Sequence, residues 1–251
     1  MTGNRITQDI GDAFFNDGHW YTLTSMSLGG MSPDELSIAL GDRTGKRIRE
    51  LMENAICLPL AFDADCVLDL RTRFVIGDLS EEEAAEWIAR VRAPLAIPDG
   101  KFVLIAGGMP EHFEAIGSDG ADGYVTVNVE PGCYIIEVYA FVGSYTVNEL
   151  FYQEGDREAD SSAEAPSAKR LQDWWRNTRG NSPLPEWLEQ WTGDCYVDND
   201  DCELLAYIIR LVKSNEKIPI PPQDEDYEWW VTEFQSREPA KCPRGIKFHA
   251  G

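Results

Sequence analysis

The chain has 251 residues, a length that fits one large domain or two small ones. Hydrophobic residues make up 43% of the sequence and aromatic residues 11%, which is enough apolar material for a packed core and excludes a disordered chain. The 44 acidic residues outnumber the 22 basic ones, and the net charge of −22 argues against binding to nucleic acid or to an anionic membrane, because both would repel the protein.

Two features of the sequence favour the cytoplasm. The first residues, Met1 to Asp9, contain no apolar core of the kind found in a secretory signal. No window approaches the roughly 18 apolar residues that a membrane-spanning helix needs. We therefore expect a cytoplasmic protein whose six cysteines are reduced. Most of them should be small core residues, and Cys133 lies in a segment that we expect to form a buried strand.

The first third of the chain predicts strands and short helices. Residues 20–26 are rich in β-forming side chains and predict a strand. Residues 32–35, Ser-Pro-Asp-Glu, are typical of a helix start, and Gly41 should end that helix. Spaced apolar residues predict a second helix over 46–54, and the apolar run 55–62 should be buried.

The clearest helix signal begins at Ser80. Together with Glu83 this serine forms a capping box, in which each side chain satisfies a backbone amide at the other residue. Apolar residues then recur on one helical face as far as Val91, and we expect the helix to continue until Pro94 ends it. A tight turn at 98–100 precedes a predicted strand at 101–106.

The best hairpin signal covers residues 123–142. Two β-rich segments flank the sequence Glu130-Pro131-Gly132, which suits a type II turn because proline sets a φ near −65° and glycine allows a positive φ. The strands of this part of the chain outnumber its helices and follow one another closely. We therefore predict an α+β fold with an antiparallel, sheet-rich N-terminal part, packed helices and a more helical C-terminal segment.

One composition change suggests a division of the chain. Residues 153–168 are polar and acidic and predict a linker or exposed loop between a sheet-rich domain at 1–152 and a helical, tryptophan-rich segment at 169–251, packed on the first. In the second part, apolar residues at helical spacing predict a strong helix over 204–212, capped by the acids that precede it.

No catalytic motif stands out. The chain has no complete phosphate-binding loop, no nucleophile elbow and no CxxC pair, and the acids between Asp194 and Glu203 depart from the EF-hand pattern. We therefore expect no metal and no cofactor, and an enzyme is the less favoured reading. The one candidate for acid–base chemistry is His112, which follows the double glycine Gly107-Gly108.

The leading hypothesis is an acidic binding protein that masks a basic protein partner, as an immunity protein masks a toxin. Charge steers such partners together and aromatic side chains anchor them. The predicted contact residues are the acids and tryptophans of two C-terminal segments: Asp194, Asp198, Asp200, Asp201, Asp224, Glu225, Asp226, Trp229 and Trp230. Two alternatives stay open: an enzyme whose site forms only in space near His112, and a structural subunit of a larger assembly.

Overall fold

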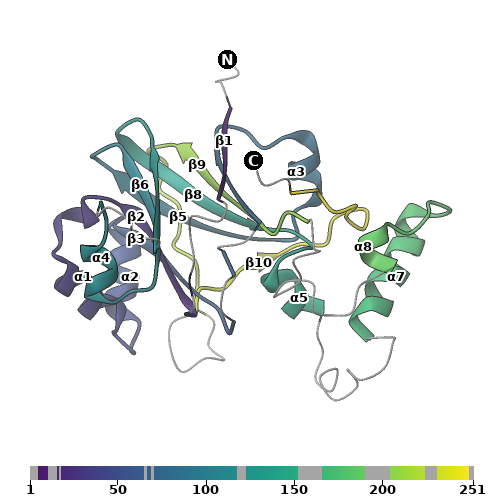
Figure 1. Cartoon of the computed structure of the whole chain (residues 1–251), viewed down its shortest axis with the longest axis horizontal. Coiled ribbons are helices and arrows are strands. Elements are labelled where there is room, and N and C mark those ends of the chain that lie inside the picture. Colours follow the sequence, from purple (N-terminus) through teal and green to yellow (C-terminus); the bar gives the residue numbers. More distant parts are fainter. Residues whose placement is uncertain are drawn as a thin grey trace.

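Two β-sheets and several short helices build the protein (Figure 1). The computed structural model describes residues 5–10, 16, 18–64, 67–68, 71–117, 123–151, 166–189, 204–223 and 231–248. The mixture of sheets and helices confirms the predicted α+β class. Within the described residues, no helix combines the length and the apolar character needed to cross a membrane.

The larger sheet has six strands. Their order across the sheet is β1 (Ile6–Ile10), β4 (Thr72–Ile76), β9 (Tyr207–Lys213), β8 (Gly132–Ala140), β5 (Ala89–Ile97) and β10 (Gln235–Ser236). Neighbouring strands run antiparallel except β4 and β9, which are parallel. A strand from late in the sequence therefore lies between two strands from its first 140 residues.

The smaller sheet has four antiparallel strands. Their order is β3 (Cys57–Ala61), β2 (Trp20–Ser25), β6 (Lys101–Ala106) and β7 (Tyr124–Asn128). The main core lies between the two sheets. There Phe74 of β4 packs against Phe102 of β6 with ring centroids 5.1 Å apart, and the ring of Phe62 contacts Tyr21 and Tyr207.

Helices cover the outer face of the four-stranded sheet. They are α1 (Pro33–Leu40), α2 (Lys46–Glu53) and α4 (Pro110–Glu114), which gather on one side of Figure 1 beside β2, β3 and β6. Leu36, Leu51 and Phe113 from these helices bury Val103 and Ile105 of β6 in a second core. The helices α7 (Pro166–Arg179) and α8 (Glu186–Glu189) lie at the opposite side of the same view, and α5 (Tyr145–Phe151) lies nearer the centre.

The C-terminal residues return to α3 (Glu81–Glu86). The two carboxylate oxygens of Glu86 accept hydrogen bonds from the backbone nitrogens of Arg244 and Gly245, at 2.9 and 3.1 Å. Burial raises the pKa of Glu86 because its charged form loses water, although these hydrogen bonds act in the opposite direction. Ile246 then joins a small apolar cluster on the outer face of the six-stranded sheet.

The helix that starts at Ser80 is shorter than predicted. Its capping box is present, but α3 ends at Glu86, and residues 89–97 form the strand β5 instead of continuing to Pro94 as helix. Buried and partly exposed residues alternate along β5, which is the period of a strand. Pro94 is tolerated because β10 pairs only with the first two residues of β5, so no strand among the described residues needs an N–H from Pro94 on that side.

The predicted hairpin at 123–142 is also wrong, although both of its strands exist. The strand β7 pairs with β6 in the smaller sheet, whereas β8 pairs with β5 and β9 in the larger one. The turn at 130–132 therefore carries the chain from one sheet to the other. Cys133, expected in a buried position, is exposed at the start of β8.

The helix predicted over 204–212 is wrong as well, since residues 207–213 form β9. This strand is covered on both faces. Ile209 and Leu211 belong to the main core, while Ile208 packs with Val75 and Tyr139 on the other side of the sheet. A strand buried on two faces shows a continuous apolar run, which at this length also fits the spacing of a helix.

Candidate functional site

The nine predicted contact residues, Asp194, Asp198, Asp200, Asp201, Asp224, Glu225, Asp226, Trp229 and Trp230, all lie outside the described residues. Their role as a binding surface stays a prediction. Most of the predicted linker at 153–168 lies outside them too, and its last residues begin α7 at Pro166.

His112, the candidate for acid–base chemistry, lines a hollow of about 650 Å³. His112 and the double glycine at 107–108 form one wall of it, and the start of β2 with parts of α1 and α2 form the others. We call this hollow the Trp20 pocket and define it by six of its lining residues: Trp20, Leu40, Ile48, Gly108, Met109 and His112.

The double glycine is what lets two aromatic rings approach the turn. Gly107 has a φ of +103°, and a Cβ at this position would lie 2.0 Å from Nδ1 of His112. A Cβ on Gly108 would lie 3.2 Å from Nε1 of Trp20. The His112 ring thus occupies space that a side chain at 107 would fill, and a side chain at 108 would crowd the Trp20 ring, which is the use of glycine at a close approach.

The orientation of His112 follows from one hydrogen bond. The backbone nitrogen of Met109 donates to Nδ1 of His112 over 3.2 Å. A neutral imidazole that accepts at Nδ1 carries its proton on Nε2. The Nε2 edge of the ring is therefore a hydrogen-bond donor.

Trp20 has a backbone oxygen with two hydrogen-bond donors and an indole N–H that is itself a donor. Its backbone oxygen accepts hydrogen bonds from Gly107 N at 2.7 Å and from the Asn16 side chain at 2.9 Å, which fixes the start of β2 against the turn. Its indole nitrogen, in contrast, is buried without an acceptor among the residues that the structure describes. A buried donor left without a partner costs about 1–3 kcal/mol.

Charged groups stand at the edge of the Trp20 pocket. The Asp42 carboxylate accepts hydrogen bonds from the backbone of Arg47 and from the backbone and hydroxyl of Thr44. These bonds, that from Arg47 above all, lower the pKa of Asp42 and keep it ionised. Asp63 and Arg43 are both exposed, and neither has an ion-pair partner in the described part of the chain.

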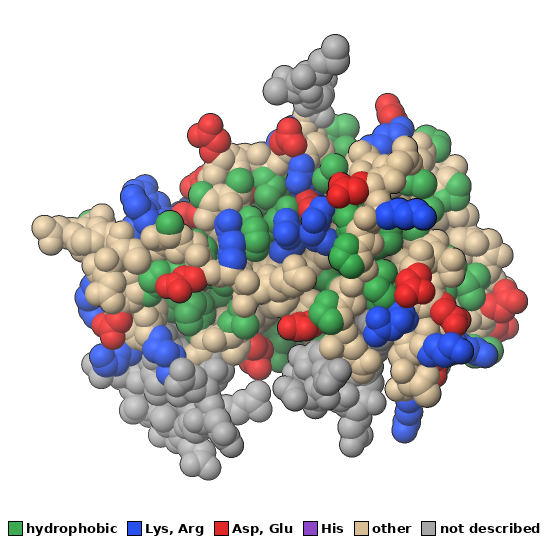
Figure 2. All heavy atoms as spheres, turned by 180° about the vertical axis from the view of Figure 1, so that it is seen from behind, with side chains coloured by type: hydrophobic (Ala, Val, Ile, Leu, Met, Phe, Trp, Pro, Cys, Tyr) green, Lys and Arg blue, Asp and Glu red, His purple; other side chains and the backbone are tan. Residues whose placement is uncertain are grey.

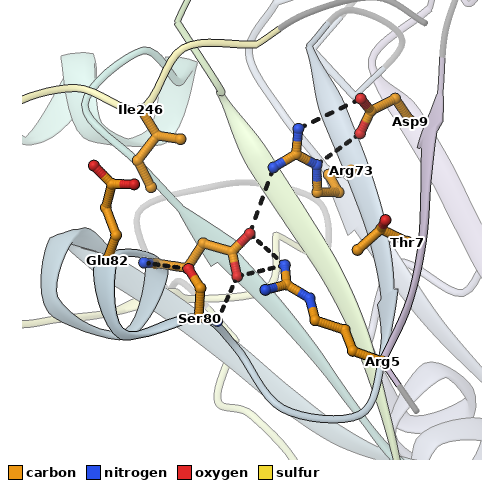
Figure 3. A pocket seen from close by; sticks show the side chains of 8 residues that line it. Arg5, Thr7, Asp9, Arg73, Ser80, Glu82 and Ile246 are labelled. Carbon is orange, nitrogen blue, oxygen red and sulfur yellow. Dashed lines mark hydrogen bonds and ion pairs between the residues drawn. The ribbon is translucent and has the colours of Figure 1, made fainter.

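A second hollow, of about 520 Å³, is lined by a chain of ion pairs (Figure 3). Arg5 donates to both oxygens of Glu83 at 2.6 and 2.7 Å, Arg73 lies 3.5 Å from the same carboxylate, and Nε of Arg73 donates to Asp9 at 2.7 Å. The guanidinium groups of Arg5 and Arg73, both labelled in Figure 3, thus share the buried carboxylate of Glu83. The positive and negative charges compensate one another. The ion pairs join β1 and the segment before it to β4 and α3, so we assign them a structural role and call them the clamp.

Two of the six cysteines are unsuited to nucleophilic chemistry. Cys57 and Cys242 are buried, and burial raises the pKa of each thiol to about 12. A thiol that stays protonated at neutral pH is a poor nucleophile. Cys66, Cys195 and Cys202 lie outside the described residues.

Comparisons with known proteins do not place the chain in a family. No family model matches it, and no curated protein does. It is similar to a solved structure described as "Crocagin biosynthetic gene J", with 12% identity and a TM-score of 0.38, over 84% of this chain and 96% of that one. A likeness this distant carries no argument about function.

One wall of the Trp20 pocket, the double glycine with His112, could be recognised in the sequence. The glycines followed by a histidine marked one wall, because Gly107 and Gly108 stand close to His112 in the chain. Trp20 and Asp63 were missed because they come from other segments and meet this wall only in space. Neither position carries a local signal for a binding site in the sequence.

Proposed function

We propose that the protein binds a small molecule in the Trp20 pocket. The observation that carries this proposal is the hollow itself, which the start of β2, parts of α1 and α2 and the turn after β6 line together. Leu40, Ile48 and Met109 add apolar walls, and His112 adds a polar side chain. Apolar walls with a few converging polar groups are typical of ligand sites, and the volume of about 650 Å³ lies in their usual range.

A fragment screen by saturation-transfer NMR tests the proposal. In the variant Met109→Trp a larger side chain narrows the mouth, and since Met109 is 54% exposed the fold should tolerate it. The matched control is Ile38→Trp, on the same side of the molecule but outside the pocket, where the side chain is 62% exposed. Fragments that bind the wild type should lose binding to Met109→Trp and keep it with Ile38→Trp. No bound fragment, or equal binding to both variants, would overturn the proposal.

A second candidate is the acidic cytoplasmic protein that masks a basic partner, such as a toxin. The distribution of charge along the chain favours it. Of the 44 acidic residues 24 lie in the described ranges, together with 21 of the 22 basic ones, so most of the excess negative charge belongs to a few other segments. Figure 2 accordingly shows Lys and Arg side chains as prominent as acidic ones on the back of the molecule. Acids that serve only solubility have no reason to be concentrated in this way.

Affinity capture at low and high salt tests the second candidate. The wild-type protein should retain a basic protein at low salt and release it at high salt. A variant with Asp194, Asp198, Asp200 and Asp201 changed to Asn should lose this capture, whereas changing two exposed acids of α1, Asp34 and Glu35, should not. Equal capture by both variants would contradict an interface at the predicted residues. The third reading, a structural subunit, predicts a molecular size that grows with concentration.

A further inference from the structure

We propose that the protein binds an extended peptide, which adds as a further strand to the outer edge of β10 and lies in the groove between β10 and α7. This site is separate from the Trp20 pocket and does not depend on the function proposed for that pocket. Two properties of the groove carry the proposal: a strand edge whose backbone groups have no partner in the chain, and apolar side chains beside that edge.

The groove has a volume of about 720 Å³ and lies at one end of the six-stranded sheet. Its lining comes mainly from α5, from α7, and from β10 with the residues after it. Among the described strands β10 is the outermost on this side, so one of its edges pairs with β5 and the other faces away from the sheet. Ser236 of β10 lines the groove and is exposed.

The register of β10 decides which of its backbone groups are free. In an antiparallel pair, alternate residues turn both N–H and C=O toward the partner strand, and the residues between them turn both groups away. The nitrogen of Arg237 donates to the oxygen of Ile88 at 2.7 Å, so residue 237 faces β5, and Gln235, two positions earlier, faces it as well. Both backbone groups of Ser236 therefore point away from β5.

The far end of β5 agrees with this alternation. The nitrogen of Ala96 donates away from β8, to the oxygen of Ala55 at 2.8 Å, so the even-numbered residues of β5 turn their backbone groups away from β8. Arg90 is one of these residues and pairs with Gln235. Ser236 is left without a bond on this side, and no hydrogen bond from any other described residue reaches its N–H or C=O.

An extended peptide supplies both groups that this edge lacks. It brings a C=O for the N–H of Ser236 and an N–H for its C=O, as in other cases of strand addition. The next residue of an extended chain that turns both groups outward is Glu238, which also lines the groove. Because Pro239 favours an extended conformation in the residue before it, the edge can continue beyond β10.

Apolar side chains line the groove beside this edge. Leu150 of α5 is 49% exposed, although it is a large hydrophobic side chain. The half-buried rings of Phe151 and Trp174 lie 5.9 Å apart between centroids and line the same groove. A large aliphatic or aromatic side chain of the peptide can cover this surface, and its burial should raise the affinity about tenfold.

The charged groups of the groove are mostly occupied. The guanidinium groups of Arg170 and Arg237 donate to backbone oxygens of the chain itself. Asp173 has ion pairs with Lys169 and Arg176 of its own helix. We therefore assign the affinity to strand pairing and apolar contact. A peptide of another protein is the favoured occupant, because a net charge of −22 on each chain repels a second copy.

Short random peptides displayed on phage provide the probe. The wild-type protein should select peptides with large aliphatic or aromatic residues. Selected peptides are then synthesised with an N-methyl group at one backbone nitrogen at a time, and their dissociation constants are measured by isothermal titration calorimetry. Methylation at alternate nitrogens should weaken binding about tenfold or more, and methylation at the nitrogens between them should change it little, because only alternate N–H groups of a strand face its partner.

Two pairs of variants assign the binding to the groove. Ser236→Pro removes an N–H that points away from β5, so the sheet loses no hydrogen bond while peptide binding should fall about tenfold or more. Ser236→Ala keeps the backbone and should bind like the wild type. Leu150→Ser should weaken binding about tenfold. Its control is Ile6→Ser, since Ile6 is 53% exposed on β1 at the opposite edge of the same sheet, and this variant should bind normally.

Several outcomes would overturn the proposal. They are a selection that yields no peptide, N-methylation that is tolerated at every nitrogen, and equal binding by the wild type and a folded Ser236→Pro. If Ser236→Pro unfolds in urea titrations far more easily than the wild type, the N-methyl scan and the Leu150 and Ile6 variants decide. A dimer of the wild type that Ser236→Pro abolishes would assign the edge to a second copy instead. Peptides that respond to Met109→Trp but not to Ser236→Pro would lie in the Trp20 pocket, which refutes this inference and leaves the proposed function standing.

Discussion

The close approach at Gly107 yields a quantitative prediction for the variant Gly107→Ala. Two costs arise. A residue other than glycine at a φ of +103° is strained by about 1–2 kcal/mol. The new methyl group would also lie 2.0 Å from Nδ1 of His112, so the ring must leave its position and lose its hydrogen bond from Met109, which adds about 1 kcal/mol. The free energy of unfolding should therefore fall by about 2–3 kcal/mol.

Two controls separate the collision from the strain. Gly30 has a φ of +84° and open space around its Cβ position, so Gly30→Ala carries the strain without the collision. It should cost about 1–2 kcal/mol. In a His112→Ala background the collision disappears, and the cost of Gly107→Ala should fall to the same value. Urea unfolding followed by tryptophan fluorescence measures the wild type, the three single variants and the double variant. A cost for Gly107→Ala within about 0.5 kcal/mol of that for Gly30→Ala would refute the packing of His112 on the glycine turn.

Three further predictions concern other parts of the fold. Glu83→Gln should lower the free energy of unfolding by about 3 kcal/mol, because it leaves two arginines with a weakened partner. Glu82→Gln, on the exposed side of the same helix, should change the free energy of unfolding little. Similar losses for both variants would contradict the clamp. The raised pKa of Glu86 means that the folded protein holds this proton more tightly than the unfolded chain does. Its contribution to stability is therefore present below pH 4.5 and is lost as the pH rises through the raised pKa. The variant Glu86→Gln should gain stability relative to the wild type over that range. A difference in the free energy of unfolding between the two proteins that stays constant with pH in urea titrations would contradict this sign. In the native protein at pH 8, mass spectrometry should find Cys133 alkylated by iodoacetamide and Cys57 unmodified, and rapid modification of Cys57 would show that its strand is open to solvent.

Short-range signals in the sequence predicted the local structure well. The helix start predicted at Ser32 and the capping box predicted at Ser80 are both present, because a helix start depends on residues only a few positions apart. The elements that were misread depend on distant neighbours. Whether residues 207–213 form a helix or a strand is decided by β4 and β8, which form hydrogen bonds with the backbone of this segment on both sides. No local pattern contains this information.

The same reasoning explains the pairing error at 124–140. A proline–glycine turn between two β-rich segments favours a hairpin on local grounds alone. In the structure each segment has a better partner elsewhere, since Val127 of β7 pairs with Phe102 of β6 and Val138 of β8 pairs with Val91 of β5. The Trp20 pocket escaped prediction in part for the same reason, because it depends on how β2 meets the turn after β6.

The central place of β9 has a consequence for synthesis of the protein. The strands β4 and β8 leave the ribosome well before residues 207–213, and until then each lacks the partner that separates them in the finished sheet. A nascent chain thus carries two unpaired apolar strand edges for much of its translation, and such edges invite pairing with other chains or with chaperones. Slow translation of the last quarter of the gene should therefore lower the soluble yield more than equal slowing near its start.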